Sequence, residues 1–357
     1  MSQIIIITGQ TATGKTKKAL QIAASCNGEL INCDSRQIYK KLDIVTGKDY
    51  LEKNFIIDRK INGFDVGHYT LKILNPKLKI LNKLQTPNPK SLSQRSINPR
   101  PSTLDPSRKL RVNQRSSTNN SHSIPLWLYD VVDPKQYFSS YDYKILALDV
   151  ISDILKRGKT PIIVGGAGYY LYHLLYDIPT SGISQNWSLR NSLSNKKIEE
   201  LQNEYKGLNP DAFEKLNNSE KNNSQRLIRK IEIALYEKKH NIKSDMLHIS
   251  ASLMMNLHLP ENALKIQVLL ENNKEKLKNN IETRVDQRLK SGAIEEVKHL
   301  LKERYLKSDP GIKTIGYVQL ITYLAGKISL EEAKQEWITK ELQYTKRQET
   351  FLRKYII

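Results

Sequence analysis

Cysteine is scarce in this chain, whose 357 residues include only Cys26 and Cys33. Neither belongs to a C-x-x-C pair or to a Cys/His ligand set, so the sequence predicts no disulfide framework and no zinc site. No apolar run reaches the length of a membrane span, and the apolar N-terminal stretch leads directly into a glycine-rich turn. We therefore expect a cytoplasmic protein that does not associate with a membrane.

Acidic residues are also few relative to basic ones. There are 37 aspartates and glutamates against 57 lysines and arginines, which gives a formal net charge of +20. Such an excess indicates an extended polyanion as partner, and tRNA or another nucleic acid fits better than a small acidic metabolite. A lysine-rich solvated surface explains the charge equally well, so charge alone leaves the partner open.

The clearest motif begins at residue 4, where four consecutive isoleucines predict a strand buried on both faces, as in the middle of a parallel sheet. The next eight residues match every fixed position of the phosphate-binding loop G-x-x-x-x-G-K-T, and a helix is predicted from residue 17 to residue 24. In order, the loop residues are Gly9, Gln10, Thr11, Ala12, Thr13, Gly14, Lys15 and Thr16.

This loop predicts a polyphosphate site. Its glycines let successive backbone N–H groups face phosphate oxygens, Lys15 adds a positive charge, and the Thr16 hydroxyl is placed to hold Mg²⁺. A glycine turn that happens to fit the pattern is the less favoured alternative. The loop does not specify which polyphosphate binds.

Further buried strands, with helices between them, are predicted at residues 29–33, 126–134, 160–164 and 264–270. Asp34 comes directly after the first of these. We expect that strand to lie beside the phosphate-loop strand, so that the Asp34 carboxylate reaches the ligand crevice. The pattern predicts an α/β fold, with a P-loop NTPase-like parallel sheet flanked by helices.

Three regions are predicted along the chain. Residues 1–178 form the α/β core, residues 179–258 form a helical insertion lobe, and residues 259–357 form a return strand and C-terminal helices packed on the core. Within the core, residues 86–123 are rich in Pro, Ser, Asn and Arg and poor in aliphatic residues. Such a composition predicts a disordered basic loop.

Three features of the sequence each allow two interpretations. The Gly165-Gly166 pair permits either a close approach of the backbone to a ligand or tight packing between a strand and a helix. Leu227 and Ile231 lie on the apolar face of a predicted helix. Arg226 and Arg229 share its other side, which could contact a ligand but is ordinarily solvated. Residues 343–354 combine four cations with two aromatic residues, which suits either a nucleic-acid backbone or an amphipathic closing helix.

Taken in order, these motifs resemble the tRNA dimethylallyltransferase family, also called tRNA isopentenyltransferases. The resemblance covers nearly the whole chain except residues 49–124. The matching segments are Gly9–Thr16, Asp34–Tyr39, Asp130–Pro134, Val164–Tyr170, Gln225–Arg229, Ile315–Tyr317 and Lys346–Arg353.

The resemblance implies transfer of a dimethylallyl group from dimethylallyl diphosphate to N6 of the adenine on the 3′ side of the tRNA anticodon. Diphosphate, which residues 9–16 would bind, is the leaving group. Asp34 would act as general base, while Thr11, Lys15, Arg229 and a Mg²⁺ ion at Thr16 would stabilise the charge on that leaving group. We expect a monomer that takes the anticodon stem-loop of tRNA and dimethylallyl diphosphate as its partners.

The resemblance also implies that the target adenine leaves its stack and enters a channel, gripped by the helical insertion lobe. The residues assigned to the tRNA side are Asp34, Ser35, Arg36, Gln37, Gly166, Ala167, Arg190, Gln225, Arg226, Leu227, Ile228 and Arg229.

The chain departs from the family pattern at several positions. Gln10 stands where the family usually has proline, and Ala167 replaces a threonine. Asn272-Asn273 replaces a common Asp-Arg pair, so we expect weaker binding of the prenyl donor or compensation by another cation. Three alternatives stay open: a P-loop small-molecule kinase, an adenylate isopentenyltransferase acting on free AMP or ADP, and an RNA-binding homologue without catalysis.

Overall fold

The structure, a computed structural model, describes residues 3–48, 51, 54–73, 122–176, 178, 180, 183, 185–242 and 253–357. Almost all of the predicted basic loop at residues 86–123 lies outside these residues. The chain divides into two compact units. The first consists of Met1–Tyr137, Asp153–Ala167 and Leu264–Ile357, and the second consists of Phe138–Ser152 and Gly168–Ala263.

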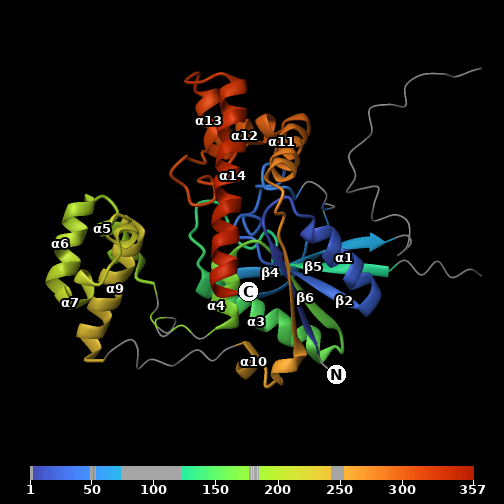
Figure 1. Ribbon diagram of the computed structural model, residues 1–357, viewed down its shortest axis with the longest axis horizontal. Helices are drawn as coiled ribbons and strands as arrows, with labels where there is room; N and C mark the ends of the chain where they lie inside the picture. The colour runs from blue at the N-terminus through green and yellow to red at the C-terminus, as the bar shows by residue number, and fades with distance from the viewer. Residues whose placement is uncertain are drawn as a thin grey trace, which may run out of the picture. The chain divides into compact units, whose positions relative to one another are not determined.

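A seven-stranded sheet forms the centre of the first unit, with the strand order β3-β4-β5-β2-β6-β1-β7 (Figure 1). The strands are β1 (Ile4–Gly9), β2 (Gly28–Asn32), β3 (Ile56–Ile61), β4 (Phe64–Ile73), β5 (His122–Trp127), β6 (Thr160–Gly165) and β7 (Leu264–Leu269). The pairs that join β5, β2, β6, β1 and β7 are all parallel. This confirms the predicted P-loop-like parallel core.

Three details of the sheet differ from the sequence-based prediction. First, β6 lies between β1 and β2, so the strand that carries Asp34 is not the direct neighbour of the phosphate-loop strand. Second, β3 and β4 form an antiparallel hairpin that extends the sheet beyond β5. Third, β5 begins at His122 and ends at Trp127, whereas a strand-like stretch over residues 126–134 was predicted.

Apolar burial explains why β1 occupies the inside of the sheet. Ile4, Ile6 and Ile7 are at most 1% exposed, and every residue of β2 is buried. Helix α1 (Lys15–Cys26) buries Ala19, Leu20 and Ala23, which pack into the same apolar cluster as residues of β1, β2 and β6. Because α1 starts at Lys15, the phosphate loop connects a buried strand directly to a helix.

The first unit is completed by helices that follow β7. They are α11 (Lys274–Lys290), α12 (Ala293–Lys302), α13 (Tyr317–Leu324) and α14 (Leu330–Tyr355). Helix α14 lies against β1, α11 and α13, and it buries Trp337, Thr345, Gln348 and Leu352. The closing helix predicted from residues 343–354 is therefore the second half of a longer, partly buried helix.

The second unit is helical. Its helices are α3 (Ser140–Lys156) up to Ser152, α4 (Gly168–Leu175), α5 (Trp187–Leu193), α6 (Ile198–Leu208), α7 (Pro210–Glu214), α8 (Asn218–Lys221), α9 (Ser224–His240) and α10 (Leu253–Asn256). Leu201, Leu227 and Ile231 are completely buried in the apolar core that α5, α6, α7 and α9 share. As expected, no strand occurs in the described residues from 187 to 242. Across the described part of the chain, no helix combines the length and the apolar character that crossing a membrane requires.

Candidate active site

The phosphate loop adopts the cradle that its sequence predicts. Gly9, Ala12 and Gly14 have φ values of 147°, 64° and 81°, a region that L side chains rarely adopt. A Cβ atom on Gly9 would lie 2.0 Å from the carbonyl oxygen of Leu269 in the neighbouring strand β7. Glycine at position 9 is therefore required by both the backbone conformation and the contact with β7.

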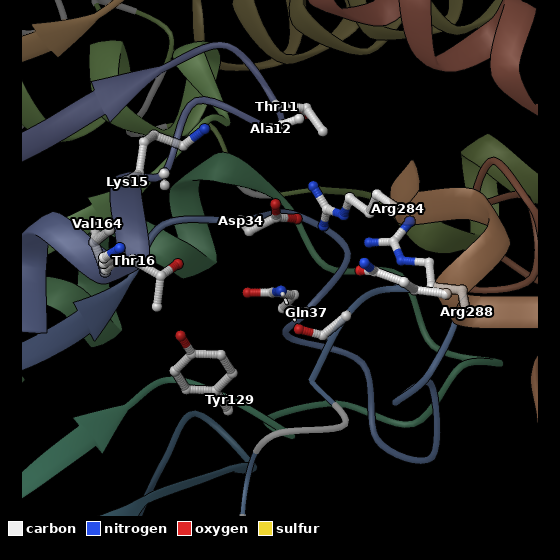
Figure 2. Close-up of a pocket in the computed structure, with 15 residues that line it drawn as sticks. Thr11, Ala12, Lys15, Thr16, Asp34, Gln37, Tyr129, Val164, Arg284 and Arg288 are labelled. Carbon is white, nitrogen blue, oxygen red and sulfur yellow. Dashed lines mark hydrogen bonds between the residues drawn. The ribbon is translucent and has the colours of Figure 1, made fainter. Parts of the chain in front are cut away.

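A cavity of about 360 Å³ opens beside this loop (Figure 2). Lys15 and Thr16 line it from the start of α1, Asp34 lines it from the end of β2, and Arg284 and Arg288 line it from α11. In Figure 2 the carboxylate of Asp34 and the guanidinium groups point toward the same space. The cavity therefore brings one carboxylate and several cations together, an arrangement that suits a ligand with more than one negative charge.

Lys15 is held close to the loop that precedes it. Its ammonium group donates a hydrogen bond to the carbonyl oxygen of Gln10. Burial and the charge of Arg284 lower the pKa of Lys15 to about 8, although Asp34 acts in the opposite direction. A bound anion would offset both effects, because it favours the charged form of the lysine.

Asp34 presents a carboxylate to the cavity. Its backbone N–H donates to the side-chain oxygen of Asn32 at 3.1 Å, and its Oδ1 accepts from the backbone N–H of Arg36 at 2.8 Å. Among the described residues its Oδ2 has no hydrogen-bond partner, which leaves this oxygen available to a substrate. Ser35 is half-buried beside it, and Arg36 is exposed and donates to the carbonyl oxygen of Pro310 at 3.4 Å.

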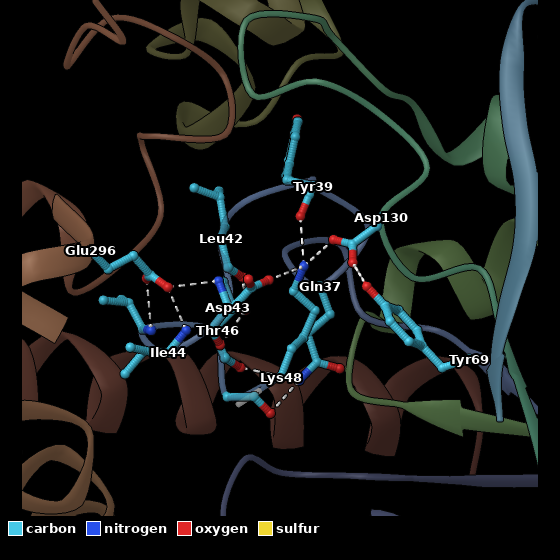
Figure 3. A network of polar contacts seen from close by, with 12 residues as sticks. Gln37, Tyr39, Leu42, Asp43, Ile44, Thr46, Lys48, Tyr69, Asp130 and Glu296 are labelled. Atoms are coloured by element: carbon cyan, nitrogen blue, oxygen red, sulfur yellow. Dashed lines mark hydrogen bonds and ion pairs between the residues drawn. The ribbon is translucent and has the colours of Figure 1, made fainter. Parts of the chain in front are cut away.

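The loop that follows Gln37 is fixed by buried polar contacts (Figure 3). Gln37 donates to the carbonyl oxygens of Thr46 and Gly47 at 3.1 and 3.4 Å. Lys48, which is buried, pairs with Asp130 and donates to the carbonyl oxygen of Tyr39 at 2.8 Å. These contacts hold Gly47 at the wall of the cavity, and they give a structural role to Asp130, the first residue of the matching segment Asp130–Pro134.

Helix α12 holds the same loop from the other side. Glu296 accepts hydrogen bonds from the backbone N–H groups of Asp43, Ile44 and Val45 at 3.0, 2.7 and 3.2 Å. It also accepts one from the hydroxyl of Tyr317 at 2.5 Å. Burial raises the pKa of Glu296 even though these bonds favour its charged form.

Gln348 on α14 connects two of the predicted site segments. Its side-chain oxygen accepts from the backbone N–H of Thr11 at 2.8 Å and from the Thr11 hydroxyl at 3.2 Å. Its side-chain nitrogen donates to the carbonyl oxygen of Gly166 at 2.9 Å. The motif around Gln348 was recognised in the sequence, but its position beside the phosphate loop depends on the tertiary fold.

Both glycines of the Gly165-Gly166 pair pack against the protein itself. A Cβ on Gly165 would lie 1.9 Å from the carbonyl oxygen of Cys33, and one on Gly166 would lie 2.2 Å from the side-chain nitrogen of Gln348. Ala167 is 8% exposed, and its backbone N–H donates to the carbonyl oxygen of Cys33 at 3.1 Å. The double glycine thus serves tight packing, one of the two interpretations that its sequence allows.

The remaining sequence-predicted site residues belong to the second unit. Glu232 pairs with both Arg190 and Arg229, at 2.6 and 2.5 Å. Arg229 also donates to the carbonyl oxygens of Thr180 and Ile183 at 2.9 and 3.0 Å. Within this unit, Arg190 and Arg229 are therefore held by a shared carboxylate.

The start of α9 presents only part of its predicted motif to solvent. Gln225 and Arg226 are exposed. Leu227 is completely buried and Ile228 is 8% exposed, because both belong to the core of the helical unit. Their side chains pack inside the helical unit and are not available to contact RNA. Of residues 225–228, which were predicted to contact tRNA, only Gln225 and Arg226 therefore present side chains that could do so.

Sequence reasoning missed Arg284 and Arg288. They are four residues apart on α11, so they share one face of the helix, and this spacing is the only signal that the sequence offers. A Cβ on Gly47 would lie 2.8 Å from Nη2 of Arg288 and 3.1 Å from Nη2 of Arg284. The two guanidinium groups therefore lie together over Gly47.

A second cavity, of about 330 Å³, shares Thr11, Asp34 and both α11 arginines with the first. It extends to residues of α14 and the segment before α13. The residues that line it only on this side include Arg36, Lys313, Tyr344 and Arg347. Asp34 thus lies where two polar cavities meet.

Comparisons with known proteins agree on one family. Residues 112–355 match the family model described as IPP transferase. A tRNA dimethylallyltransferase of Acetivibrio thermocellus is 31% identical over 359 residues, which cover 99% of this chain and 90% of that protein. A tRNA dimethylallyltransferase of Anoxybacillus flavithermus is 30% identical over 351 residues, with 98% of this chain and 87% of that protein covered.

Solved structures show the same fold. A tRNA delta(2)-isopentenylpyrophosphate transferase from Staphylococcus epidermidis superposes with a TM-score of 0.52 and 24% identity, covering 100% of this chain and 92% of that one. A eukaryotic dimethylallyltransferase acting on tRNA gives a TM-score of 0.63 and 21% identity, covering 99% of this chain and 70% of that one.

Proposed function

The chain belongs to the IPP transferase family, and we propose that it transfers a dimethylallyl group from dimethylallyl diphosphate to tRNA. The acceptor is N6 of the adenine on the 3′ side of the anticodon, and the product that leaves is diphosphate. One observation carries the proposal beyond the family: Asp34 and Thr11 line both cavities. A diphosphate beside Lys15 and an adenine in the second cavity would therefore meet at Asp34.

The leaving group determines what the first cavity has to supply. As the allylic C1–O bond breaks, its electron pair goes to the diphosphate, and the developing charge must be neutralised. The N–H groups of the phosphate loop, the start of α1 and Lys15 are suited to this task. The Thr11 hydroxyl is held by Gln348 at the junction of the two cavities, where it faces both substrates.

Asp34 is the proposed general base. The adenine amine is a weak nucleophile because its lone pair is delocalised into the ring, so it must be oriented toward C1 and lose a proton as the new bond forms. Oδ1 of Asp34 is fixed by the backbone N–H of Arg36 at 2.8 Å. This contact orients the carboxylate while Oδ2 remains free to accept the proton from N6.

A divalent cation is typical of prenyl transfer from a diphosphate, and we propose Mg²⁺. Among the described residues, no group of three or more His, Cys, Asp or Glu side chains could hold a metal ion. This fits Mg²⁺, which binds through few protein ligands together with water and substrate phosphates. The Thr16 hydroxyl and the diphosphate would hold it, and when bound it would add positive charge at the leaving group.

The RNA partner is proposed from the family and from the charge of the chain. Arg36, Gln37 and the exposed Gln225 and Arg226 keep the tRNA contacts that the resemblance assigns to them. In the first unit, α14 adds a face of cations and aromatic rings. This face includes Lys346, Arg347, Phe351, Lys354 and Tyr355.

The test is a prenyl-transfer assay with Mg²⁺ and labelled dimethylallyl diphosphate. Unmodified tRNA and AMP are offered separately, and ATP turnover is measured in parallel. We expect label on tRNA, and we expect Asp34→Asn to lower kcat by about 10²–10⁴-fold, the usual contribution of a general base. The control Asp211→Asn removes an exposed carboxylate at the start of α7 and should leave kcat unchanged.

Three results would contradict the proposal. Label on AMP rather than tRNA would identify an adenylate isopentenyltransferase, and ATP turnover without prenyl transfer would identify a kinase. Full activity of Asp34→Asn would remove Asp34 from the role of base.

A further inference from the structure

Two arginines, Arg284 and Arg288, line the α11 side of the first cavity. Arg284 has no hydrogen bond or ion pair in the part of the chain that the structure describes, although it is only partly exposed. Arg288 is 6% exposed and has Glu341 at 3.4 Å. Both guanidinium groups lie over Gly47, close to one another.

Two adjacent guanidinium groups repel each other, and burial weakens the screening of that repulsion by water. Among the described residues that line the same cavity, Asp34 is the one carboxylate, while Lys15 and Lys17 add further positive charge from the start of α1. An arrangement of this kind is favourable when a ligand with several negative charges lies between the cations. A diphosphate has the required charge, and its oxygens match the planar donor fork of arginine.

Position 273, directly before α11, lacks the cation that the family pattern places there. Asn273 is the N-cap residue of α11, and its side-chain oxygen accepts from the backbone N–H of Lys276 at 3.0 Å. It stabilises the helix and carries no charge. The same helix presents its arginines to the cavity farther along its length, at positions 284 and 288.

We propose that Arg284 and Arg288 bind the diphosphate of the prenyl donor from the α11 side of the cavity and supply the positive charge that Asn273 does not. This inference rests on the proposed function and names the residues that compensate for a departure from the family pattern. Arg284 has no other partner among the described residues, so it is the main ligand. Arg288 is held beside it by Glu341 and contributes a second donor group.

The two arginines line the second cavity as well, so a phosphate of the tRNA could offer the same chemistry. The diphosphate is the better fit because Lys15 and Thr16, at the start of α1, line only the first cavity. Binding of inorganic diphosphate and binding of tRNA are therefore measured separately.

The experiment uses the full chain with Mg²⁺ and inorganic diphosphate as the probe, titrated in a calorimeter, and unmodified tRNA in a separate filter-binding assay. We expect Arg284→Gln to weaken diphosphate binding roughly tenfold or more, since a hydrogen bond to a charged group is lost. The diphosphate affinity of Arg284→Lys should lie between that of the unsubstituted chain and that of Arg284→Gln, because lysine keeps the positive charge but loses the planar pair of N–H donors. In Arg284→Gln we therefore expect diphosphate affinity to fall tenfold while tRNA affinity changes less than twofold.

The matched control is Arg353→Gln, which removes an exposed arginine paired with Glu349 on α14, and it should leave diphosphate binding unchanged. Arg288→Gln and the double variant should weaken binding further, and thermal denaturation shows whether these variants are folded. If Arg288→Gln does not fold, Arg284→Gln decides the question alone, because Arg284 has no hydrogen bond or ion pair with the described residues to lose.

Two outcomes would overturn the inference: diphosphate affinity that is unchanged in Arg284→Gln, or a loss that falls on tRNA binding instead. Its failure is distinct from failure of the proposed function. If the unsubstituted chain prenylates tRNA and Arg284→Gln binds diphosphate normally, the proposed function stands and this inference is wrong. If the chain binds diphosphate through Arg284 but does not prenylate tRNA, this inference stands and the proposed function is wrong.

Discussion

The arginines of the helical unit and Arg284 in the phosphate cavity are held in opposite ways. In the helical unit, Glu232 is buried and pairs with both Arg190 and Arg229. In the cavity, Arg284 has no such partner among the described residues, and Lys15 lies near it. Arg190 and Arg229 therefore hold the helical unit together, whereas Arg284 is available to a ligand.

The pKa values of the two regions express the same contrast. Burial alone would raise the pKa of Glu232, but its hydrogen bonds with Arg190 and Arg229 outweigh burial and lower it. Burial and Arg284 together lower the pKa of Lys15. Charges in the helical unit therefore stabilise one another in the protein alone, whereas Lys15 and Arg284 in the cavity repel each other, an effect that a bound anion would offset.

The largest expected effect comes from removing the carboxylate that neutralises the helical unit. Glu232→Gln leaves two arginines without their partner, and we expect the free energy of unfolding to fall by about 3 kcal/mol, as when one member of a buried pair is removed. Urea denaturation followed by circular dichroism measures this change. The control Glu199→Gln, at an exposed position in the first turn of α6, should change it by less than about 0.5 kcal/mol.

If the comparison is right, Glu232→Gln destabilises the protein without weakening its affinity for inorganic diphosphate. Unchanged stability would show that the pairing of Glu232 with Arg190 and Arg229 does not stabilise the helical unit. The helical unit and the cavity would then not differ in this respect.

A second buried carboxylate, Glu29, extends the comparison to the first unit. Burial on its own would raise the pKa of Glu29, but Arg157, Lys159 and Trp127 donate hydrogen bonds that hold it at about 2, below the ordinary value of 4.5. Because the folded pKa is lowered, this group stabilises the protein above pH 4.5 and loses that contribution as the pH falls toward 2. We expect a loss of about 2 kcal/mol, after allowance for the screening of the partly exposed cations.

Urea denaturation between pH 5 and pH 2 measures this loss. Glu29→Gln should be less stable at pH 5, and its stability should fall less steeply with acid than that of the unsubstituted chain. Parallel curves for the two proteins would contradict the assignment.

The sequence predicted best what depends on local patterns. The strand, loop and helix over residues 4–26 follow from an apolar run, two glycines and a lysine, and the structure shows them where they were expected. The apolar face of the helix that carries Arg229 also predicted the burial of Leu227. The family motif nevertheless assigned Leu227 to the RNA, and here the physical pattern was the better guide.

Strand order and the α11 arginines were not predictable for a physical reason. Whether β2 pairs with β1 or with β6 is decided by packing between residues far apart in the chain. Charged residues on a helix are ordinarily solvated, so Arg284 and Arg288 gave little signal in the sequence. Only the tertiary fold brings α11 over Gly47.

Arg229 allows the comparison to be tested within one residue, because the family motif assigns it to the diphosphate. Arg229→Gln removes contacts with Glu232 and with the carbonyl oxygens of Thr180 and Ile183. We expect the free energy of unfolding to fall by about 1.5 kcal/mol, at the lower end for hydrogen bonds of charged groups. Diphosphate affinity, measured by calorimetry, should stay within twofold of the unsubstituted chain. A tenfold loss of affinity would instead give Arg229 the catalytic role that the family motif predicts.

The smallest expected effect concerns Gln10, which replaces the family's proline in the phosphate loop. Its side chain is 2% exposed, donates to Glu349 at 3.2 Å and accepts from the backbone N–H of Glu271 at 2.9 Å. Gln10→Ala should lower the free energy of unfolding by about 1 kcal/mol, measured by urea denaturation. Diphosphate affinity should change less than threefold, because Lys15 contacts the carbonyl oxygen of Gln10 and not its side chain. A tenfold loss of diphosphate affinity would show that the phosphate loop depends on the polar contacts of Gln10. In that case the same side chain would serve both the structure of the loop and ligand binding.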